Sequence, residues 1–288
     1  MSTPPATLHR MRFTKHLILT TTAALATTLA ACTPSPTPDE ALVGMHQEAL
    51  HDAQALAVST PDASALRSEH AEEITAEIER LCGFTDDGIL PESCTFETPD
   101  IAAAPASDGA SHMMASQEQI LDHLGEIPTE SVPLIIGQYI EQARLAPPPE
   151  EITIPEDLSL KGEDLTRAQD LLAGEYAATW ALGVALAYVS PDLTDATQDA
   201  IDRHREYAAV LRTTITPFAD TAPSEPGYDL AGLTEPTDPD SALTLIREVQ
   251  DNAVTSWHNA ASVATDPGWR ILASRIAGAT ARDTVTFD

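Results

Sequence analysis

Glu175 is a single carboxylate in the middle of an apolar stretch, LLAGEYAATWALGVALAYVS, which covers residues 171–190. A carboxylate removed from water requires a metal ion, a histidine, an arginine or a proton as its partner, because an unpaired buried charge is strongly unfavourable. A histidine is available on the next helical stretch, where His204 lies at the centre of an apolar arc that includes Ile201 and Leu211. Carboxylate and imidazole are groups that transfer protons and bind transition metals.

Glu175 and His204 are expected at the same level of a helix bundle. Glu175 lies about 12 residues before its helix ends and His204 about 13 residues after the next helix begins, which are similar lengths at ~1.5 Å per residue. We therefore expect the two side chains to meet in the interior. Three interpretations remain open: a hydrogen-bonded pair that fixes the register of the helices, a site for one divalent metal such as zinc or manganese, or a catalytic pair.

Four helices in residues 164–288 must position this pair. Helical periodicity predicts them at about 164–188, 191–215, 239–264 and 267–283. Three of them begin with a polar capping residue followed by proline, as in Asp238-Pro239 and Asp266-Pro267. The first and third connections are short and the second is long and proline-rich. This pattern is typical of a ferritin-like four-helix bundle with one long crossover.

The N-terminal part is also expected to be helical, so the sequence predicts an all-α chain. Within residues 40–144, helices are predicted at about 40–58, 61–82, 113–125 and 129–144, and residues 145–163 are interpreted as a proline-rich linker. Roughly 257 residues after the leader allow one large domain or two small ones. Glu48 and His51 have the Glu-x-x-His spacing of a metal motif. They lie opposite the apolar stripe of their helix, and we interpret them as a solvated face.

The first residues have the pattern of a lipoprotein signal peptide. Three basic residues precede an apolar core and the sequence Leu29-Ala-Ala-Cys32. Residues 1–31 are therefore expected to be removed and Cys32 to carry acyl chains such as palmitate, with residues 32–39 as a proline-rich tether. These features predict a protein anchored to the outer face of the cell membrane through Cys32. An ordinary secretory signal with a chance cysteine is the alternative.

Cys82 and Cys94 are the remaining two cysteines. Outside the cytoplasm, an isolated pair that closes a short loop is expected to form a disulfide, which here would pin the loop to the end of a helix. A metal site is the weaker alternative, because the pair lacks the tight Cys-x-x-Cys spacing of a zinc knuckle.

The charge of the chain excludes one class of partner. The chain has 15 lysine and arginine residues against 45 aspartate and glutamate residues, a formal charge of −30. Removal of residues 1–31 takes away three basic residues and no acidic residue, which leaves −33. A surface this acidic repels the phosphate backbone of nucleic acids and anionic lipid headgroups, so no nucleic-acid partner is expected.

Several spaced segments in residues 164–288 resemble an uncharacterised ferritin-like domain of actinobacterial proteins, which are often envelope lipoproteins. The segments are Leu171-Leu-Ala-Gly-Glu-Tyr-Ala-Ala, Asp202-Arg-His-Arg-Glu-Tyr-Ala-Ala-Val-Leu, Leu245-Ile-Arg-Glu with Trp257, and Thr265-Asp-Pro with Ala277–Arg282. The resemblance implies a ferritin-like four-helix bundle and no established activity. It also implies that the recurring polar positions fall on Glu175, His204 and Glu248, although Glu248 lies well off the centre of the apolar arc.

The ligand set of a di-iron centre is incomplete. Such a bundle needs a Glu from each of two helices and a Glu-x-x-His from each of the other two. Ile201 stands three residues before His204, and the last helix contains neither Glu nor His, so at most Glu175, His204, Glu248 and Asp283 could hold one divalent metal. We therefore expect a non-enzymatic binding or accessory protein that needs no cofactor, with another envelope protein as its candidate partner. The alternative is a mononuclear metal-binding or oxidoreductase protein that uses Glu175, His204 and Glu248.

Overall fold

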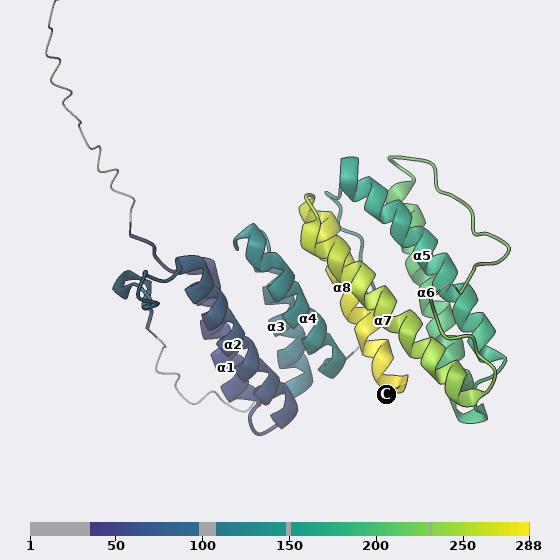
Figure 1. Cartoon of the computed structure of the whole chain (residues 1–288), viewed down its shortest axis with the longest axis horizontal. Coiled ribbons are helices and arrows are strands. Elements are labelled where there is room, and N and C mark those ends of the chain that lie inside the picture. Colours follow the sequence, from purple (N-terminus) through teal and green to yellow (C-terminus); the bar gives the residue numbers. More distant parts are fainter. Residues whose placement is uncertain (1–34, 98–107, 148–150, 231, 288) are drawn as a thin grey trace, which may run out of the picture. The chain divides into compact units, whose positions relative to one another are not determined.

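The computed structural model describes residues 35–97, 108–147, 151–230 and 232–287, and these residues form eight α-helices and no β-strand. In chain order, the helices are α1 (Glu40–Leu56), α2 (Pro61–Cys82), α3 (Gly109–His123), α4 (Val132–Leu145), α5 (Gly162–Leu186), α6 (Thr194–Ile215), α7 (Pro239–Val263) and α8 (Pro267–Thr284) (Figure 1). The predicted all-α fold is confirmed. Helix α3 begins four residues earlier than expected, because Asp108 accepts a hydrogen bond from the backbone N–H of Ser111 and caps it.

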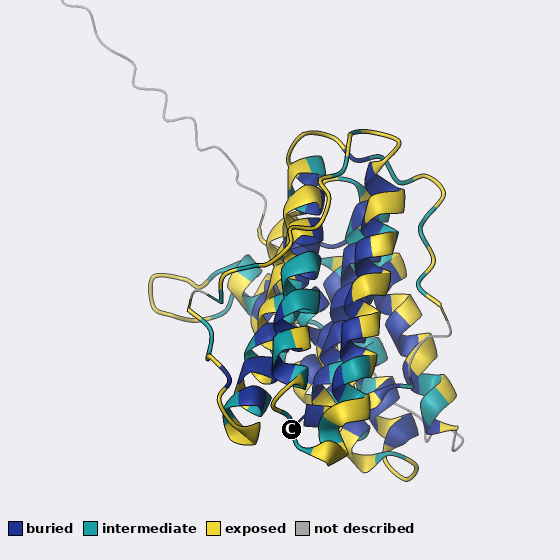
Figure 2. Ribbon diagram, turned by 90° about the vertical axis from the view of Figure 1, so that its right-hand side faces the viewer, coloured by how far each residue is buried: buried dark blue, intermediate teal, exposed yellow. Residues whose placement is uncertain are grey.

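Helices α5 to α8 form a four-helix bundle. Helix α5 packs on α6 and α7, and α7 packs on α8. Helix α6 reaches α8 where Arg203 forms an ion pair with Asp283 at 3.1 Å. The buried faces of the helices turn towards one another and the exposed residues lie on the outside (Figure 2).

The directions of these helices require a long crossover. Asp164 at the start of α5 accepts hydrogen bonds from the backbone N–H groups of Thr265 and Asp266, which follow the end of α7, so α5 and α7 are antiparallel. The short connection 187–193 makes α5 and α6 antiparallel as well. Helix α6 therefore ends at the opposite end of the bundle from the start of α7, so the connection between these two helices has to cross the length of the bundle. The predicted crossover is confirmed.

Capping residues set the starts of the last two helices, as predicted. Asp238 accepts a hydrogen bond from the backbone N–H of Ser241, and the Ser241 hydroxyl oxygen accepts one from the backbone N–H of Asp238, which completes a capping box. Asp266 accepts from the backbone N–H of Trp269 at 2.8 Å. Helix α6 begins differently, because its proline stands in a short 3-10 turn, Pro191–Leu193, that precedes the α-helix.

The N-terminal helices pack on the bundle instead of forming a separate body. Residues Pro36–Asp288 are one compact unit, in which α4 packs on α8 and α7 and one apolar core includes residues from α1 to α8. The end of the predicted linker that leads into α5 is also held in place. Leu160 is buried, and the backbone N–H of Ser159 donates to Asp266 at 3.2 Å.

The tight packing of α4 on α8 depends on Gly278. A Cβ atom at this position would lie 2.8 Å from a ring carbon of Tyr139 and 3.0 Å from the Cβ of Ala143. We expect Gly278→Ala to lower the free energy of unfolding by about 1–3 kcal/mol, because the two helices must move apart. Gly183→Ala is the matched control, since a Cβ there meets nothing within 4 Å, and it should stabilise α5 by about 0.5–1 kcal/mol. Thermal unfolding of both variants checks this, and equal effects would contradict the close approach.

The predicted disulfide is confirmed, because Cys82 at the end of α2 is bonded to Cys94. The loop between them is therefore pinned to the helix end. Cys32 and the predicted signal peptide, residues 1–31, lie outside the described residues. Among the described residues, none of the helices combines the length and the apolar character that a membrane span requires.

Candidate functional site

Glu175 and His204 meet in the interior of the bundle. His204 Nδ1 lies 2.6 Å from Glu175 Oε2, and the two residues are 1% and 3% exposed. Helix α7 contributes two further polar groups to this site. Trp257 Nε1 donates to Glu175 Oε1 at 2.6 Å, and His204 Nε2 lies 3.0 Å from Gln250 Oε1. Together Glu175, His204, Gln250 and Trp257 form a buried chain of hydrogen bonds, which we call the bundle quartet.

The bundle quartet favours the charged form of the histidine. His204 Nδ1 faces the carboxylate of Glu175 and Nε2 faces the amide oxygen of Gln250, and a ring that is protonated at both nitrogens donates to both of these acceptors. Burial opposes this charge, but the adjacent Glu175 carboxylate and the hydrogen bond to Gln250 outweigh it and raise the pKa of His204 above its ordinary value. The quartet is therefore a buried ion pair in which both oxygens of Glu175 and both ring nitrogens of His204 have hydrogen-bond partners.

A prediction about pH follows from the raised pKa of His204. The unfolded histidine titrates near a pKa of about 6.5, and the folded one titrates at higher pH. The stabilisation by the charged ring is therefore complete below the unfolded pKa and is lost as the pH rises through the folded value. Denaturant unfolding across this range should show a decline of up to about 1.4 kcal/mol per pH unit. The decline should be absent from the double variant Glu175→Leu/His204→Leu, and its persistence there would assign it to other groups.

Glu248 does not join Glu175 and His204. Its two carboxylate oxygens accept hydrogen bonds from the backbone N–H and the hydroxyl of Thr234, at 2.7 and 2.9 Å. Thr234 belongs to the crossover, so Glu248 fastens this segment to α7. The structure thus brings together two of the three residues proposed as metal ligands, and gives the third a different partner.

Asp283 lies beside the quartet without joining its hydrogen-bond chain. Its carboxylate forms the ion pair with Arg203 and accepts a hydrogen bond from the hydroxyl of Tyr207. Burial raises the pKa of Asp283, while Arg203, Arg282 and His204 oppose this shift. The ring of Tyr207 stands edge-on to that of His204, with centroids 6.0 Å apart. Asp283 therefore ties α8 to α6 next to the quartet.

The donor set of this site does not fit a di-metal centre. Metal ions bind the lone pair of an unprotonated ring nitrogen, and both nitrogens of His204 lie within hydrogen-bond distance of a protein group, Nδ1 of Glu175 and Nε2 of Gln250. Glu248 is bonded to the crossover, and the position that completes the quartet is an amide, Gln250. A ferritin-type pair of metals would need further glutamates and a second histidine, and α8 contains neither of these residue types; its one carboxylate, Asp283, is paired with Arg203.

A small apolar cleft adjoins the quartet. It lies between α5 and α7 under the crossover, has a volume of about 160 Å³, and has Glu175 in its wall. The aromatic rings of Trp180 and Tyr228 line it, with centroids 6.3 Å apart, and Gly227 of the crossover packs against the indole of Trp180. The rest of the lining is mostly small or apolar, with Leu171, Ala178, Ala181, Leu230, Leu233 and Val249 among the residues. The crossover thus forms one wall of a cleft that a small apolar group fits.

Sequence reasoning missed two members of the quartet. Gln250 is absent from the candidate residues, and Trp257 enters only through the family resemblance, without a role for its N–H. A signal for Gln250 was present, because it follows Ile246 by four residues and precedes Trp257 by seven, which places all three on one face of α7. A polar residue on this buried face requires a partner.

One comparison with known proteins gives a match, and this match covers the helices that carry the bundle quartet. Residues 168–287 match a family described as a domain of unknown function (DUF4439). The match contains all four members of the bundle quartet. Neither the curated proteins nor the solved structures include a match to this chain.

Proposed function

We propose that this chain is a lipid-anchored protein of the outer face of the cell membrane, and that its ferritin-like bundle acts as a binding or accessory subunit. The observation that supports a binding role best is the contrast between two neighbouring sites. The bundle quartet has both nitrogens of its histidine engaged, while the adjoining cleft offers an unfilled apolar volume of about 160 Å³. In this proposal the ion pair of Glu175 and His204 has a structural role inside the bundle, and the cleft beside it receives the ligand.

The size of the cleft favours a protein partner. Pockets for whole small molecules typically have volumes of about 300–1,000 Å³, and this cleft is smaller. A single apolar side chain of a partner would fill it, with Trp180 and Tyr228 as its aromatic walls. The strongly acidic chain would then favour a partner with a basic rim around that side chain.

Co-purification from detergent-solubilised membranes tests the binding role. The wild-type chain should retrieve one protein in stoichiometric amount, and Ala253→Phe should lose it, because Ala253 lines the cleft and the larger ring would fill it. Ala209→Phe is the matched control, since Ala209 is an exposed alanine of α6 and does not line the cleft. Repeated recovery of the lone wild-type chain, or equal recovery with both variants, would refute a partner at the cleft.

Mass spectrometry tests the membrane anchor independently. We expect the mature chain to begin at Cys32 and to carry the mass of a lipid there. Cys32→Ser should shift the protein from the membrane fraction to the soluble fraction. A chain that is cleaved elsewhere, or that stays on the membrane after this change, would contradict lipid anchoring.

The rival proposal is a mononuclear metal-binding or oxidoreductase protein that uses Glu175, His204 and Glu248. Elemental analysis of the purified protein distinguishes the two, with Glu175→Gln and His204→Gln as variants that keep the size of each side chain. About one metal ion per chain that is lost in both variants would favour the rival. Metal content that is independent of both residues would leave the quartet as a structural pair.

A further inference from the structure

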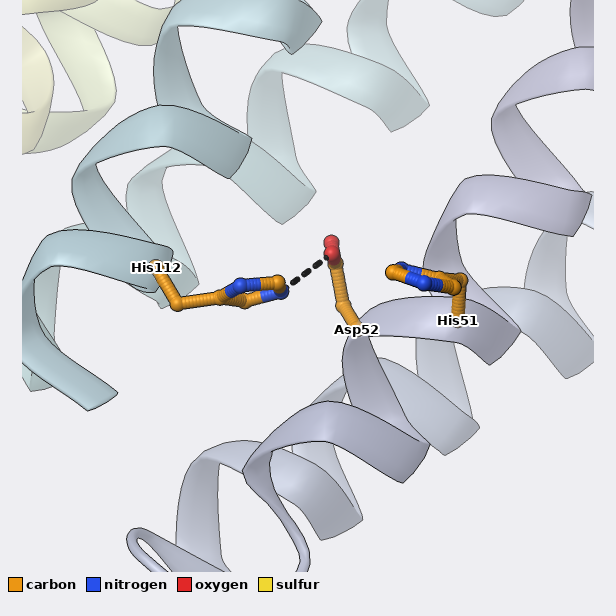
Figure 3. Close-up of side chains that lie close together, drawn as sticks. All are labelled: His51, Asp52 and His112. Carbon is orange, nitrogen blue, oxygen red and sulfur yellow. Dashed lines mark hydrogen bonds and ion pairs between the residues drawn. The ribbon is translucent and has the colours of Figure 1, made fainter. Parts of the chain in front are cut away.

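We propose that His51, Asp52 and His112 form a binding site for one transition-metal ion of the zinc class, in the N-terminal helical part of the chain. His51 and Asp52 are on α1 and His112 is on α3. One ligating atom from each residue lies within 4.8 Å of the other two. The two imidazole rings approach the Asp52 carboxylate from opposite sides (Figure 3).

The carboxylate of Asp52 is held in position by groups that leave one oxygen for the histidines. Oδ2 accepts hydrogen bonds from Arg67 Nε at 3.0 Å and from the hydroxyl of Ser116 at 2.7 Å. Oδ1 faces His112, whose Nε2 lies 2.7 Å away. Asp52 is 4% exposed and Arg67 3% exposed. Outer partners that fix the orientation of a ligating carboxylate in this way are typical of protein metal sites.

The geometry can accept an ion with small movements. Ligand atoms lie about 2.0–2.2 Å from a zinc ion, so two tetrahedral ligands are roughly 3.4 Å apart. The hydrogen bond between Asp52 and His112 must open by less than one ångström for an ion to enter. His51 is exposed and His112 is partly exposed, so both rings can turn while the buried carboxylate stays in place.

The chemistry of the three ligands selects the class of ion. Two imidazoles with one carboxylate suit zinc, copper, nickel or cobalt, whereas calcium and magnesium prefer oxygen ligands alone. Arg67 neutralises Asp52 and lowers the local attraction for a cation. The acidic chain as a whole, at a formal charge of −30, opposes this effect by attracting cations to its surface. Three protein ligands, of which His51 is exposed, leave at least one coordination position of a tetrahedral ion open to water.

Calorimetric titration of the purified protein with zinc chloride tests this site. We expect saturable binding of one ion per chain, with an affinity reduced at least about tenfold in His51→Ala and in His112→Ala. His123→Ala is the matched control, because His123 is another partly exposed histidine of α3 with two nearby carboxylates, Glu126 at 2.8 Å and Glu48 at 4.0 Å. The affinity of the His123→Ala variant for zinc should equal that of the wild type.

Cobalt provides a second, spectroscopic readout, because the absorption of the bound ion reports which groups ligate it. Bound cobalt should show the visible absorption bands of a site with nitrogen ligands, and these bands should be lost in His51→Ala, where an exposed side chain is removed. No saturable zinc binding by the wild type would overturn the proposal. Binding that persists in both histidine variants, or that falls equally in His123→Ala, would overturn it as well.

Discussion

Replacement of Glu175 by leucine is expected to lower the free energy of unfolding by about 3–5 kcal/mol, because it leaves a buried charge without its partner. The protonated ring of His204 loses the carboxylate that lies 2.6 Å from Nδ1, and Trp257 loses the acceptor 2.6 Å from its Nε1. Neither group can turn to water, since His204 is 1% exposed and Trp257 is 0% exposed. Denaturant unfolding followed by circular dichroism measures the loss.

A double-mutant cycle separates the pairing from the loss of packing. Glu175→Leu/His204→Leu removes both charges together, so it should be more stable than the sum of the single effects predicts, by about 1.5 kcal/mol or more. Glu163→Leu is the control on the same helix. Its side chain is 87% exposed and pairs with Arg167 at 3.4 Å, so this change should have little effect. Additive effects of the two quartet substitutions would contradict the pairing.

The meeting of Glu175 and His204 could be predicted because it depends on local quantities. The connection between their helices is short, so counting residues from the turn gives the level of each side chain. The apolar arc of each helix gives the direction in which the side chain points. Glu175 and His204 are the polar side chains at the centres of otherwise apolar arcs, so the sequence alone identifies them.

The candidate metal ligand Glu248 is not the residue of α7 that contacts His204, and the reason is geometric. Residues 248 and 250 differ by about 200° around a helix, so only one of them can face the interior. The family resemblance pointed to Glu248, whereas the apolar arc pointed to the side on which Gln250 lies. In the structure Gln250 completes the quartet and Glu248 binds the crossover. The apolar arc marks the face of α7 that is buried, and Gln250 lies on that face.

The polar groups of the N-terminal helices could not be paired from the sequence. Asp52, Arg67 and His112 are on three different helices, and nothing local fixes how these helices rotate against one another. The interpretation of Glu48 and His51 as a solvated pair considered one helix alone. The residue that brings His51 into a candidate metal site is His112, which follows it by 61 positions in the chain. Such a contact is visible only once the packing of the helices is known.

Replacement of Arg67 by leucine is the second change with a large expected effect. It should lower the free energy of unfolding by about 3–5 kcal/mol. Arg67 donates to Asp52 through Nε and to His70 through Nη1, at 3.0 and 3.2 Å. Burial lowers the pKa of Arg67, but the Asp52 carboxylate opposes this shift and keeps the guanidinium charged. In Arg67→Leu the buried carboxylate of Asp52 keeps Ser116 and His112 as hydrogen-bond partners. It loses the guanidinium of Arg67, which is its permanently charged partner.

A control variant, a double variant and a chelator isolate the effect of the ion pair between Arg67 and Asp52. Arg205→Leu removes an arginine of α6 that is 59% exposed and pairs with Asp202, so it should change stability little. The double variant Arg67→Leu/Asp52→Leu should recover part of the loss, because it removes both buried charges. Unfolding must be measured with a chelator present, since a metal ion bound by Asp52 would replace the missing positive charge. A loss in Arg67→Leu no larger than in Arg205→Leu would show that the ion pair with Asp52 does not stabilise the N-terminal helices.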